Sequence, residues 1–223
     1  MNDSVYKITG LLDLDQTLAG ALFAGLAYPW EALPKIKDFL LELAAGLPRD
    51  FERIAENVWV GKGTVIEASA VIKGPAVIGY DSQIRHAAYL RENVIIGNEV
   101  TVGNSTEVKN TVLFNGAQVP HFNYAGDSIL GYKAHLGAGV ILSNVKSLKD
   151  SVKVQKPGGG YLDTGLKKFG AVIGDYVEIG CNAVLNPGTV VGKGSIIYPL
   201  TSVRGTVPPH SILKNDGRLT AKR

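Results

Sequence analysis

The sequence predicts a parallel β-helix, a solenoid of short strands, and three observations carry that prediction. Aliphatic residues recur every six positions for ten consecutive repeats, from Val60 to Phe114. Glycine often follows the aliphatic residue, as at Gly61 and Gly79, and a small residue such as Thr64 stands four places after it. A period of six fits neither a helix, which repeats every 3.6 residues, nor a flat strand, which alternates every two. It fits strands joined by tight bends, three to a triangular coil.

The period also assigns the side chains that fill the interior. Stacked coils pair their backbones at a spacing of ~4.8 Å, so the aliphatic residues form ladders inside the prism. We call these residues the inward positions: Val60, Ile66, Ile72, Ile78, Ile84, Leu90, Ile96, Val102, Val108, Phe114, Leu130, Leu136, Leu142, Ile173, Ile179, Leu185, Val191, Ile197 and Val203. At three per coil, these nineteen positions predict about six coils.

The composition limits the classes of protein to which this chain can belong. The chain has 223 residues, of which 45% are hydrophobic, so it can bury an extended core in a single domain. A net charge of only +3, with Lys and Arg dispersed, does not indicate a nucleic-acid partner. The single cysteine, Cys181, excludes an internal disulfide and a Cys-rich zinc site. Without a signal peptide or an apolar run of ~18 residues, we expect a cytoplasmic protein with no membrane partner.

The residues before the repeats have a different hydrophobic pattern. From Asp13 to Ala45, apolar residues recur at helical spacing, and Pro29 and Pro34 interrupt them, which predicts two or three short helices. We therefore expect residues 1–55 to form a helical cap over the first coil or a packing arm, because a solenoid's end exposes strand edges and ladder ends.

The β-helix is expected over residues 56–207, with an inserted loop at 145–170 and a basic, partly mobile tail at 208–223. The inserted loop is rich in lysine. A solvated loop and an anion-binding loop are equally open interpretations of it. Its turn at Gly158–Gly160 lacks the Lys-Ser/Thr of a phosphate loop and is interpreted as a hairpin turn.

A second interruption lies at Gln118–Asp127, where Pro120 replaces an inward aliphatic residue. His121, Tyr124 and Asp127 gather there within seven residues. Because such breaks in solenoids fall on loops of a functional face, and because a turn needs none of these side chains, we favour a functional site here.

The segment from Leu90 to Asn144 resembles a known family. It follows the approximate pattern LRP…GNxxExK…GHxxYxGD…IGAGxxxxN of the acetyltransferase half of the bifunctional N-acetylglucosamine-1-phosphate uridyltransferase/glucosamine-1-phosphate acetyltransferase. The resemblance is strongest over about fifty-five residues, continues weakly into the later coils and does not include the N-terminal helices. It implies a left-handed parallel β-helix and a homotrimer.

The resemblance also implies roles for four charged or titratable residues. Arg91 and Lys109 match the pair that holds the sugar phosphate, a task suited to a guanidinium fork and a point charge. His121 matches the general base that takes a proton from the amine of the sugar. Glu107 matches the carboxylate that orients this imidazole.

Three further residues are implied in substrate binding. Tyr124 matches a contact to the sugar, and Asn144 matches an asparagine beside the pocket. His135 stands where the family has an asparagine that touches the sugar, so the acceptor of this chain is expected to differ.

Three residues match the channel for acetyl-CoA. Ala138 and Cys181 correspond to positions that line it, with Cys181 in place of a serine. Pro199 replaces a small alanine near the same donor site. The resemblance thus implies acetyl-CoA as co-substrate.

Two functions of different class follow. The first is an acetyl-CoA-dependent N-acetyltransferase that acts on an amino-sugar phosphate similar to glucosamine 1-phosphate. The alternative is a non-catalytic trimerising or nucleotide-sugar-sensing module related to UDP-N-acetylglucosamine pyrophosphorylase, because the Gly-rich nucleotidyltransferase half has no counterpart in this sequence. No metal is expected, since a histidine zinc site needs a close pair and His121 and His135 stand fourteen residues apart.

Overall fold

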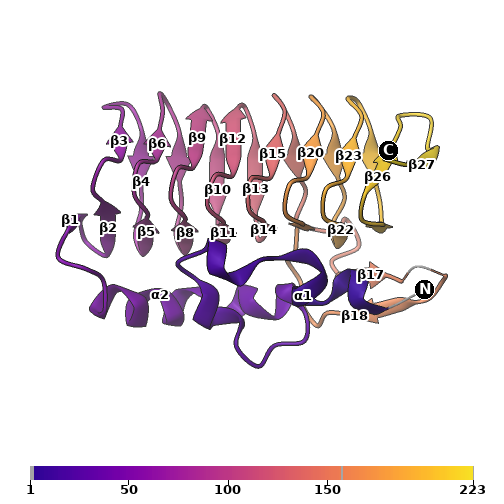
Figure 1. Cartoon of the computed structure of the whole chain (residues 1–223), viewed down its shortest axis with the longest axis horizontal. Helices are drawn as coiled ribbons and strands as arrows, with labels where there is room; N and C mark the ends of the chain where they lie inside the picture. Colours follow the sequence, from indigo (N-terminus) through magenta and orange to yellow (C-terminus); the bar gives the residue numbers. More distant parts are fainter. Residues whose placement is uncertain (1–2, 157, 223) are drawn as a thin grey trace.

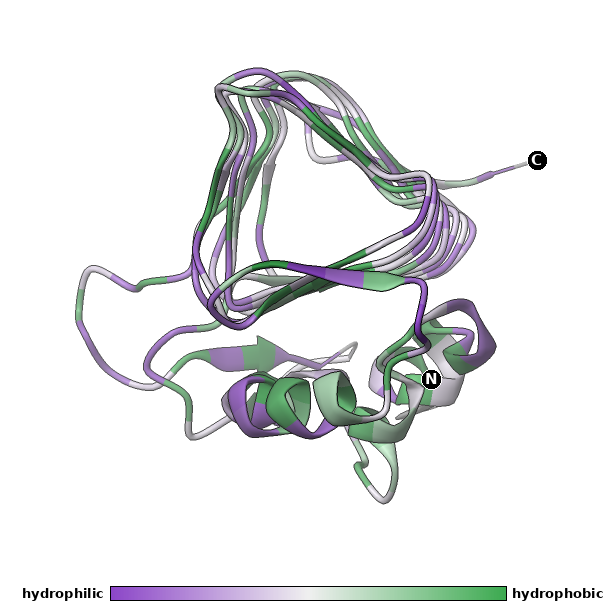
Figure 2. Ribbon diagram, turned by 90° about the vertical axis from the view of Figure 1, so that its left-hand side faces the viewer, coloured by the Kyte–Doolittle hydropathy of each residue, from purple (hydrophilic) through white to green (hydrophobic). Residues whose placement is uncertain are grey.

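The computed structural model describes residues 3–156 and 158–222 and shows a triangular prism of stacked β-coils with an arm along one side (Figures 1 and 2). Three sheets form its walls, which we call A, B and C. Wall A contains β1 (Phe51–Ala55), β2 (Val58–Gly61), β5 (Ala76–Ile78), β8 (Val94–Ile96), β11 (Thr111–Leu113), β14 (Ile129–Leu130), β19 (Ala171–Ile173), β22 (Thr189–Val191) and β25 (Thr206–Val207).

The other two walls continue each coil. Wall B contains β3 (Val65–Ile66), β6 (Gln83–Ile84), β9 (Thr101–Asn104), β12 (Gln118–His121), β15 (His135–Leu136), β20 (Glu178–Ile179), β23 (Ile196–Ile197), β26 (Ser211–Leu213) and β27 (Leu219–Ala221). Wall C contains β4 (Val71–Ile72), β7 (Tyr89–Leu90), β10 (Glu107–Lys109), β13 (Tyr124–Gly126), β16 (Ile141–Leu142), β21 (Val184–Leu185) and β24 (Ser202–Val203).

The parallel β-helix predicted from the six-residue period is confirmed, and all the inward positions except Phe114 belong to one continuous apolar core. The helix is longer than the predicted six or so coils, because its walls contain eight, eight and seven parallel strands within the described residues, besides the antiparallel β1 and β27. The prediction missed inward residues at the interruption and at the end of the ladder. They are Val119, Ala125, Val207 and Leu213.

The predicted register is wrong by one residue in the fourth coil. Ile96 pairs with Leu113, one position earlier than the spacing of Ile78 and Ile96 predicts. Leu113 therefore points inward, whereas Phe114 turns outward and packs edge-on against Phe23, with 5.9 Å between ring centroids.

The shorter coil also corrects the interpretation of Pro120. Val119 occupies the inward position, so the proline does not replace a ladder residue. Pro120 instead follows Val119 and lies directly above Gly103, where an added Cβ would come within 1.6 Å of the carbonyl oxygen of the proline. Only glycine at position 103 allows this close backbone contact.

The coils turn at residues with positive φ. On the edge between walls B and C, one such residue occurs in each successive coil: Ala87, Ser105, Phe122, Gly139, Asn182 and Leu200. Five of the six carry a side chain, and such a residue resists this conformation unless the surrounding structure stabilises it. The stacking of coils supplies that stabilisation, because the corner backbone groups hydrogen-bond between neighbouring coils.

The N-terminal segment lies along wall A as an arm (Figure 2). Its elements are η1 (Asp3–Tyr6), α1 (Ile8–Leu11), η2 (Leu14–Gln16), η3 (Gly20–Phe23), η4 (Pro29–Lys35) and α2 (Ile36–Ala45). Buried side chains of the arm, including Leu11, Trp30 and Leu40, pack against apolar residues on the outer face of wall A. The edge of the first coil is covered at wall A by β1, which pairs antiparallel with β2.

The lysine-rich insertion is an anchored hairpin. Its strands β17 (Lys153–Gln155) and β18 (Tyr161–Asp163) pair antiparallel, and Val152 and Val154 are buried in the same apolar cluster as the arm. The predicted hairpin turn at Gly158–Gly160 joins these two strands. The tail expected to be mobile also forms a hairpin, in which β26 and β27 cover the end of wall B.

Within the described part of the chain, no helix has both the length and the apolar composition that a membrane crossing requires.

Candidate active site

The predicted site residues fall into three places: the outer face of wall C, the edge between walls B and C, and the outer face of wall B. Strand alternation explains the first group, because Leu90, Val108 and Ala125 point inward and their neighbours point out. The outward residues of β7, β10 and β13 then stack in adjacent rungs, with Glu107 paired to Tyr124 and Lys109 paired to Gly126.

Asp127 is the centre of the wall C group. The residue is 4% exposed, and its carboxylate accepts hydrogen bonds from the side-chain amides of Asn110, at 2.9 Å, and Asn144, at 2.5 Å. The ammonium of Lys109 lies 3.9 Å from the same carboxylate. One buried carboxylate thus orients two amides and a cation that come from the coils on either side of its own. The sequence pattern predicts Asp127 near the site but does not predict this role.

Tyr124 lies beside this network. An added Cβ at Gly126 would come within 2.5 Å of the Tyr124 hydroxyl and 2.9 Å of the Asn144 amide nitrogen, so both groups lie over that glycine. Burial raises the pKa of Tyr124, and the nearby carboxylates of Asp127 and Glu107 raise it further. The phenol therefore stays protonated at neutral pH and can donate a hydrogen bond.

Arg91 and Glu107 form an ion pair on the same face, with 3.1 Å between guanidinium nitrogen and carboxylate oxygen. The pKa of Arg91 is raised chiefly by this hydrogen bond. Among the described residues, no hydrogen bond joins Glu107 to His121, the residue that it was expected to orient. In this structure Glu107 therefore holds Arg91.

The edge between walls B and C brings together His121 and the three residues predicted to line the donor channel. The amide of Gly139 donates to the His121 carbonyl, at 3.0 Å, which places Ala138 above His121. Backbone hydrogen bonds from Asn182 to Ala138, at 2.8 Å, and from Leu200 to Cys181, at 3.0 Å, continue the stack. His121, Ala138, Cys181 and Pro199 thus occupy equivalent corners of successive coils.

His121 and Cys181 are exposed on this edge, and Ala138 is half-buried. Neither the Ala138 nor the Cys181 amide donates a backbone hydrogen bond within the described residues. These two N–H groups are available to a ligand that lies along the edge.

His135 lies apart from the other predicted residues. It points outward from wall B, where it pairs with Gln118, and its ring nitrogen lies 2.7 Å from the carboxylate of Glu178. The structure does not bring His135 into the network around Asp127.

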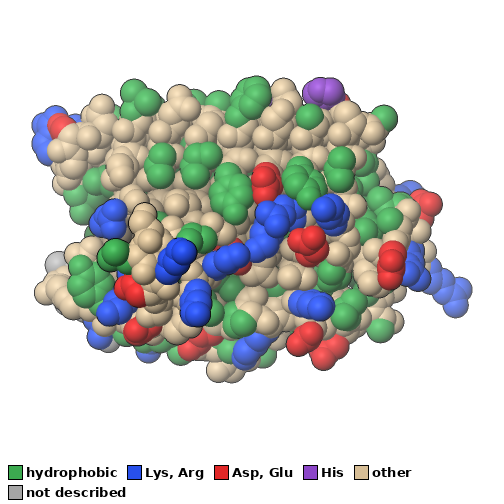
Figure 3. Space-filling model, turned by 180° about the vertical axis from the view of Figure 1, so that it is seen from behind, with side chains coloured by type: hydrophobic (Ala, Val, Ile, Leu, Met, Phe, Trp, Pro, Cys, Tyr) green, Lys and Arg blue, Asp and Glu red, His purple; other side chains and the backbone are tan. Residues whose placement is uncertain are grey.

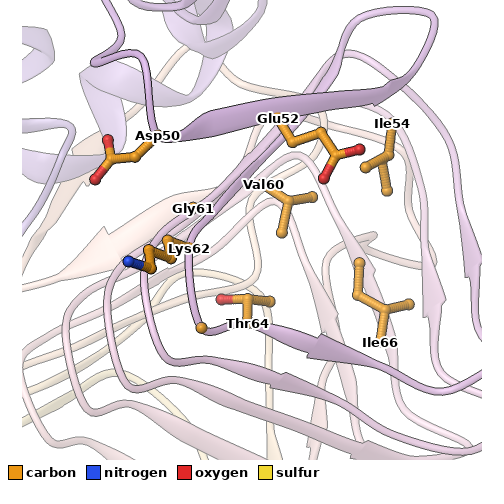
Figure 4. Close-up of a pocket in the computed structure, with 9 residues that line it drawn as sticks. Asp50, Glu52, Ile54, Val60, Gly61, Lys62, Thr64 and Ile66 are labelled. Carbon is orange, nitrogen blue, oxygen red and sulfur yellow. The ribbon is translucent and has the colours of Figure 1, made fainter.

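Wall C combines cations with apolar and aromatic groups. Figure 3 shows Lys and Arg side chains along the line where the coils meet the arm and insertion, below a row of hydrophobic side chains. Lys73 extends the cationic row by one coil and lies 5.4 Å from the centre of the Tyr89 ring. A separate hollow of about 410 Å³ lies beneath β1 and is lined by Asp50, Glu52 and Ile66 but by none of the predicted site residues (Figure 4).

No group of three or more His, Cys, Asp or Glu side chains in the described ranges is arranged to hold a metal ion.

Two family descriptions match the sequence. Residues 72–157 match the GMPPB C-terminal domain, and residues 170–205 match the bacterial transferase hexapeptide family of six repeats. The first match spans the whole network around Asp127, and the second spans the later coils with Cys181 and Pro199.

Two curated relatives illustrate the extent of the similarity. The bifunctional protein GlmU of Methanococcus maripaludis strain C5 is 30% identical over 228 residues, covering 100% of this chain and 55% of that protein. A bifunctional sugar-1-phosphate nucleotidylyltransferase/acetyltransferase of Sulfurisphaera tokodaii is 35% identical over 91 residues, covering 41% of this chain and 22% of that protein. The chain thus spans at most about half of these relatives.

Among solved structures, a mutant of AntD, an N-acyltransferase from Bacillus cereus, in complex with dTDP-4-amino-4,6-dideoxyglucose and coenzyme A, aligns with a TM-score of 0.44 and 17% identity. The alignment covers 74% of this chain and 85% of that one, a similarity too low to carry an argument about function. The sequence relatives are informative instead: this chain contains hexapeptide repeats and is similar to the bifunctional GlmU proteins, as the pattern over residues 90–144 predicts.

Proposed function

We propose that this protein is an acetyl-CoA-dependent N-acetyltransferase whose acceptor is an amino sugar that carries phosphate. One observation carries the proposal. Arg91 and Lys109, two cations that suit a phosphate, lie on wall C together with Tyr124 and Asn144, and His121 stands on the adjoining edge. The sequence similarity to bifunctional nucleotidylyltransferase/acetyltransferases supports the same reaction class.

In the proposed reaction, Arg91 and Lys109 hold the acceptor phosphate, and Tyr124 donates a hydrogen bond to the sugar. His121 takes a proton from the amine as the nitrogen attacks the thioester carbonyl. The developing oxyanion lies against the free N–H of Ala138. Breaking of the carbon–sulfur bond then releases the thiolate of coenzyme A, which receives the proton from the imidazolium.

Glu107 has two successive roles in this scheme. In the ligand-free protein it neutralises Arg91, at 3.1 Å. When a phosphate binds to Arg91, the carboxylate is released and turns toward His121, where it stabilises the imidazolium that forms. Glu107 would thus couple occupancy of the phosphate site to the basicity of His121.

We further propose that the protein is a homotrimer in the cytoplasm, because the candidate site is open to solvent in one chain and the flat prism walls offer an extended contact surface. Its single cysteine fits a reducing compartment. Light scattering at micromolar concentration should give the mass of a trimer, and a monomer would count against the shared site.

The alternative function is a non-catalytic ligand-sensing module, and the match of residues 72–157 to the GMPPB C-terminal domain favours it. The deciding experiment measures release of free thiol from acetyl-CoA with glucosamine 1-phosphate and other amino-sugar phosphates. We expect turnover that depends on His121. If the wild type shows none, or if His121→Ala reacts as fast, the module is the correct function.

A further inference from the structure

A groove lies between the insertion and the last coils, on the edge between walls C and A. It consists of two adjoining hollows of about 260 Å³ each, which share Lys146, Pro187 and Arg204. One hollow begins at Ser143, next to Asn144 of the candidate site. The other extends along the hairpin to Lys153 and Tyr161.

The hairpin side of this groove is held in place by the coils. Val152 and Val154 are fully buried against wall A, and the hydroxyl of Thr206 donates a hydrogen bond to the Gln155 carbonyl, at 2.7 Å. Gly188 lies so close to the insertion that an added Cβ would come within 2.6 Å of the Lys153 carbonyl oxygen. The groove is therefore formed before any ligand arrives, which reduces the entropy cost of binding.

The charges that line the groove are unbalanced. Lys146 is neutralised by Asp150, at 2.7 Å, and also donates to the Ser151 carbonyl, at 3.3 Å. Lys153 and Arg204 form no ion pair with any described residue, and Arg204 only reaches the side-chain oxygen of Asn186, at 3.3 Å.

One further carboxylate lies on the hairpin, at Asp163, opposite Lys153 in the strand pairing. It is engaged by the Ser151 hydroxyl, at 3.0 Å, and by the Gly165 amide, at 2.9 Å, and does not line the groove. Two cations thus face the groove without a salt bridge to any described residue, although hydrogen bonds and, to a smaller extent, the charge of Lys153 lower the pKa values of Asp150 and Asp163. Tyr161, 63% exposed, lies beside them. Two such cations suit a phosphate group, and an exposed aromatic ring suits a planar base.

We propose that this groove binds the nucleoside part of a nucleoside diphosphate, with the phosphate next to the nucleoside on Lys153 and Arg204 and the base on Tyr161. Because the groove starts beside Asn144, the bound group belongs to the acceptor, which is then a nucleotide-linked amino sugar whose sugar-linked phosphate is held by Arg91 and Lys109. This assignment rests on the proposed function, since it names the acceptor class of the same site.

Isothermal titration calorimetry tests the groove directly, with UDP, GDP and coenzyme A as probes. We expect the double variant K153A/R204A to raise the Kd of UDP or GDP at least about tenfold. A matched double variant, K167A/K168A, removes two lysines of the same insertion that do not line the groove, and it should change these Kd values less than about twofold. Equal effects of the two double variants would overturn the proposal.

Two further measurements separate the parts of the ligand. Tyr161→Ala should raise the Kd of UDP or GDP but leave the Kd of inorganic diphosphate unchanged. If both Kd values rise, Tyr161 maintains the shape of the groove and does not bind the base. If K153A/R204A weakens coenzyme A and neither UDP nor GDP, the groove holds the donor and the acceptor assignment is wrong. Melting temperatures of all variants establish that they are folded.

An assay of acetyl transfer distinguishes a failure of the groove assignment from a failure of the proposed function. If the wild type acetylates glucosamine 1-phosphate but binds neither UDP nor GDP, the proposed function stands and the groove assignment fails. If K153A/R204A specifically loses nucleotide binding while no amino sugar is acetylated, the groove assignment stands and the reaction fails.

Discussion

Wall A and wall C have the same inward ladder and opposite outer faces. On wall A the residue before each inward position is aliphatic in six successive coils, and the arm and the insertion bury all six: Val77, Ile95, Val112, Ile129, Val172 and Val190. On wall C the equivalent positions mix aliphatic, aromatic and polar residues and lie open to solvent or half-buried: Val71, Tyr89, Glu107, Tyr124, Ile141, Val184 and Ser202.

This difference shows how one repeat serves two purposes. The inward position must be apolar on every wall, because nothing else fills a dry prism. The residue type at the outward position is not restricted in this way, so it differs according to what covers each wall. On wall A it forms a second core, whereas on wall C it supplies the titratable groups of the candidate site.

The most damaging test replaces the same residue type on the two walls. Ile129→Asp on wall A should lower the free energy of unfolding by more than about 3 kcal/mol, because the carboxylate would be buried without a partner beneath the arm. Ile141→Asp on wall C should cost only about 1 kcal/mol, because that side chain is half-buried and can reach water. Chemical denaturation measures both. Equal losses would mean that wall C is covered as fully as wall A.

The next largest effect concerns the edge of wall C. We expect His121→Ala to lower kcat by roughly 10²–10⁴, because the general base is lost, with little change in melting temperature or acetyl-CoA affinity. His86 offers a matched control: it is exposed on the same edge two coils earlier, and Ser105 donates to its carbonyl, at 3.2 Å. A drop in kcat for His86→Ala of similar size would remove the special role of His121.

Glu107→Gln should give a smaller loss of kcat, roughly tenfold, because the imidazole remains but no charged carboxylate can stabilise its protonated form. The measurement is kcat with saturating amino-sugar phosphate. A change in KM alone would restrict Glu107 to its observed contact with Arg91.

Arg91→Ala should raise KM for a phosphorylated acceptor roughly tenfold and change kcat little, because the phosphate contact exists before the transition state. Arg85 on wall B, whose guanidinium binds Gln83 at 2.8 Å, is the control for loss of an exposed arginine. An acceptor without phosphate should be insensitive to both variants. If Arg91→Ala leaves KM unchanged for every phosphorylated acceptor, the phosphate lies elsewhere.

The site was predictable where a local pattern encodes it. Strand alternation and the six-residue period are enough to place Arg91, Glu107 and Lys109 on one face. Tyr124 joins that face only because the fourth coil is one residue shorter than the period. The pairs of adjacent aliphatic residues on wall A, such as Ile95-Ile96, are a further signal in the sequence, beyond the inward positions. They would have predicted a covered wall.

The rest depended on contacts between distant residues. In the fourth coil, Leu113 and Phe114 are both apolar, so the sequence permits either as the inward residue. The choice follows from interstrand pairing with Ile96 and from the space that the arm leaves for Phe114. His135 matches a position of the family's site, but it lies on wall B, where its ring contacts the carboxylate of Glu178.

By itself, the sequence determined the β-helix, most of its inward ladder and the segment that carries the candidate site, because short-range apolar periodicity selects strands and bends within each coil. Only the tertiary structure decided that the arm covers wall A, that Asp127 joins Asn110 and Asn144, and that the insertion forms a groove beside the last coils. The physical reason is separation along the chain: these contacts join residues of different coils, and their partners are set by stacking and by long-range burial of apolar surface.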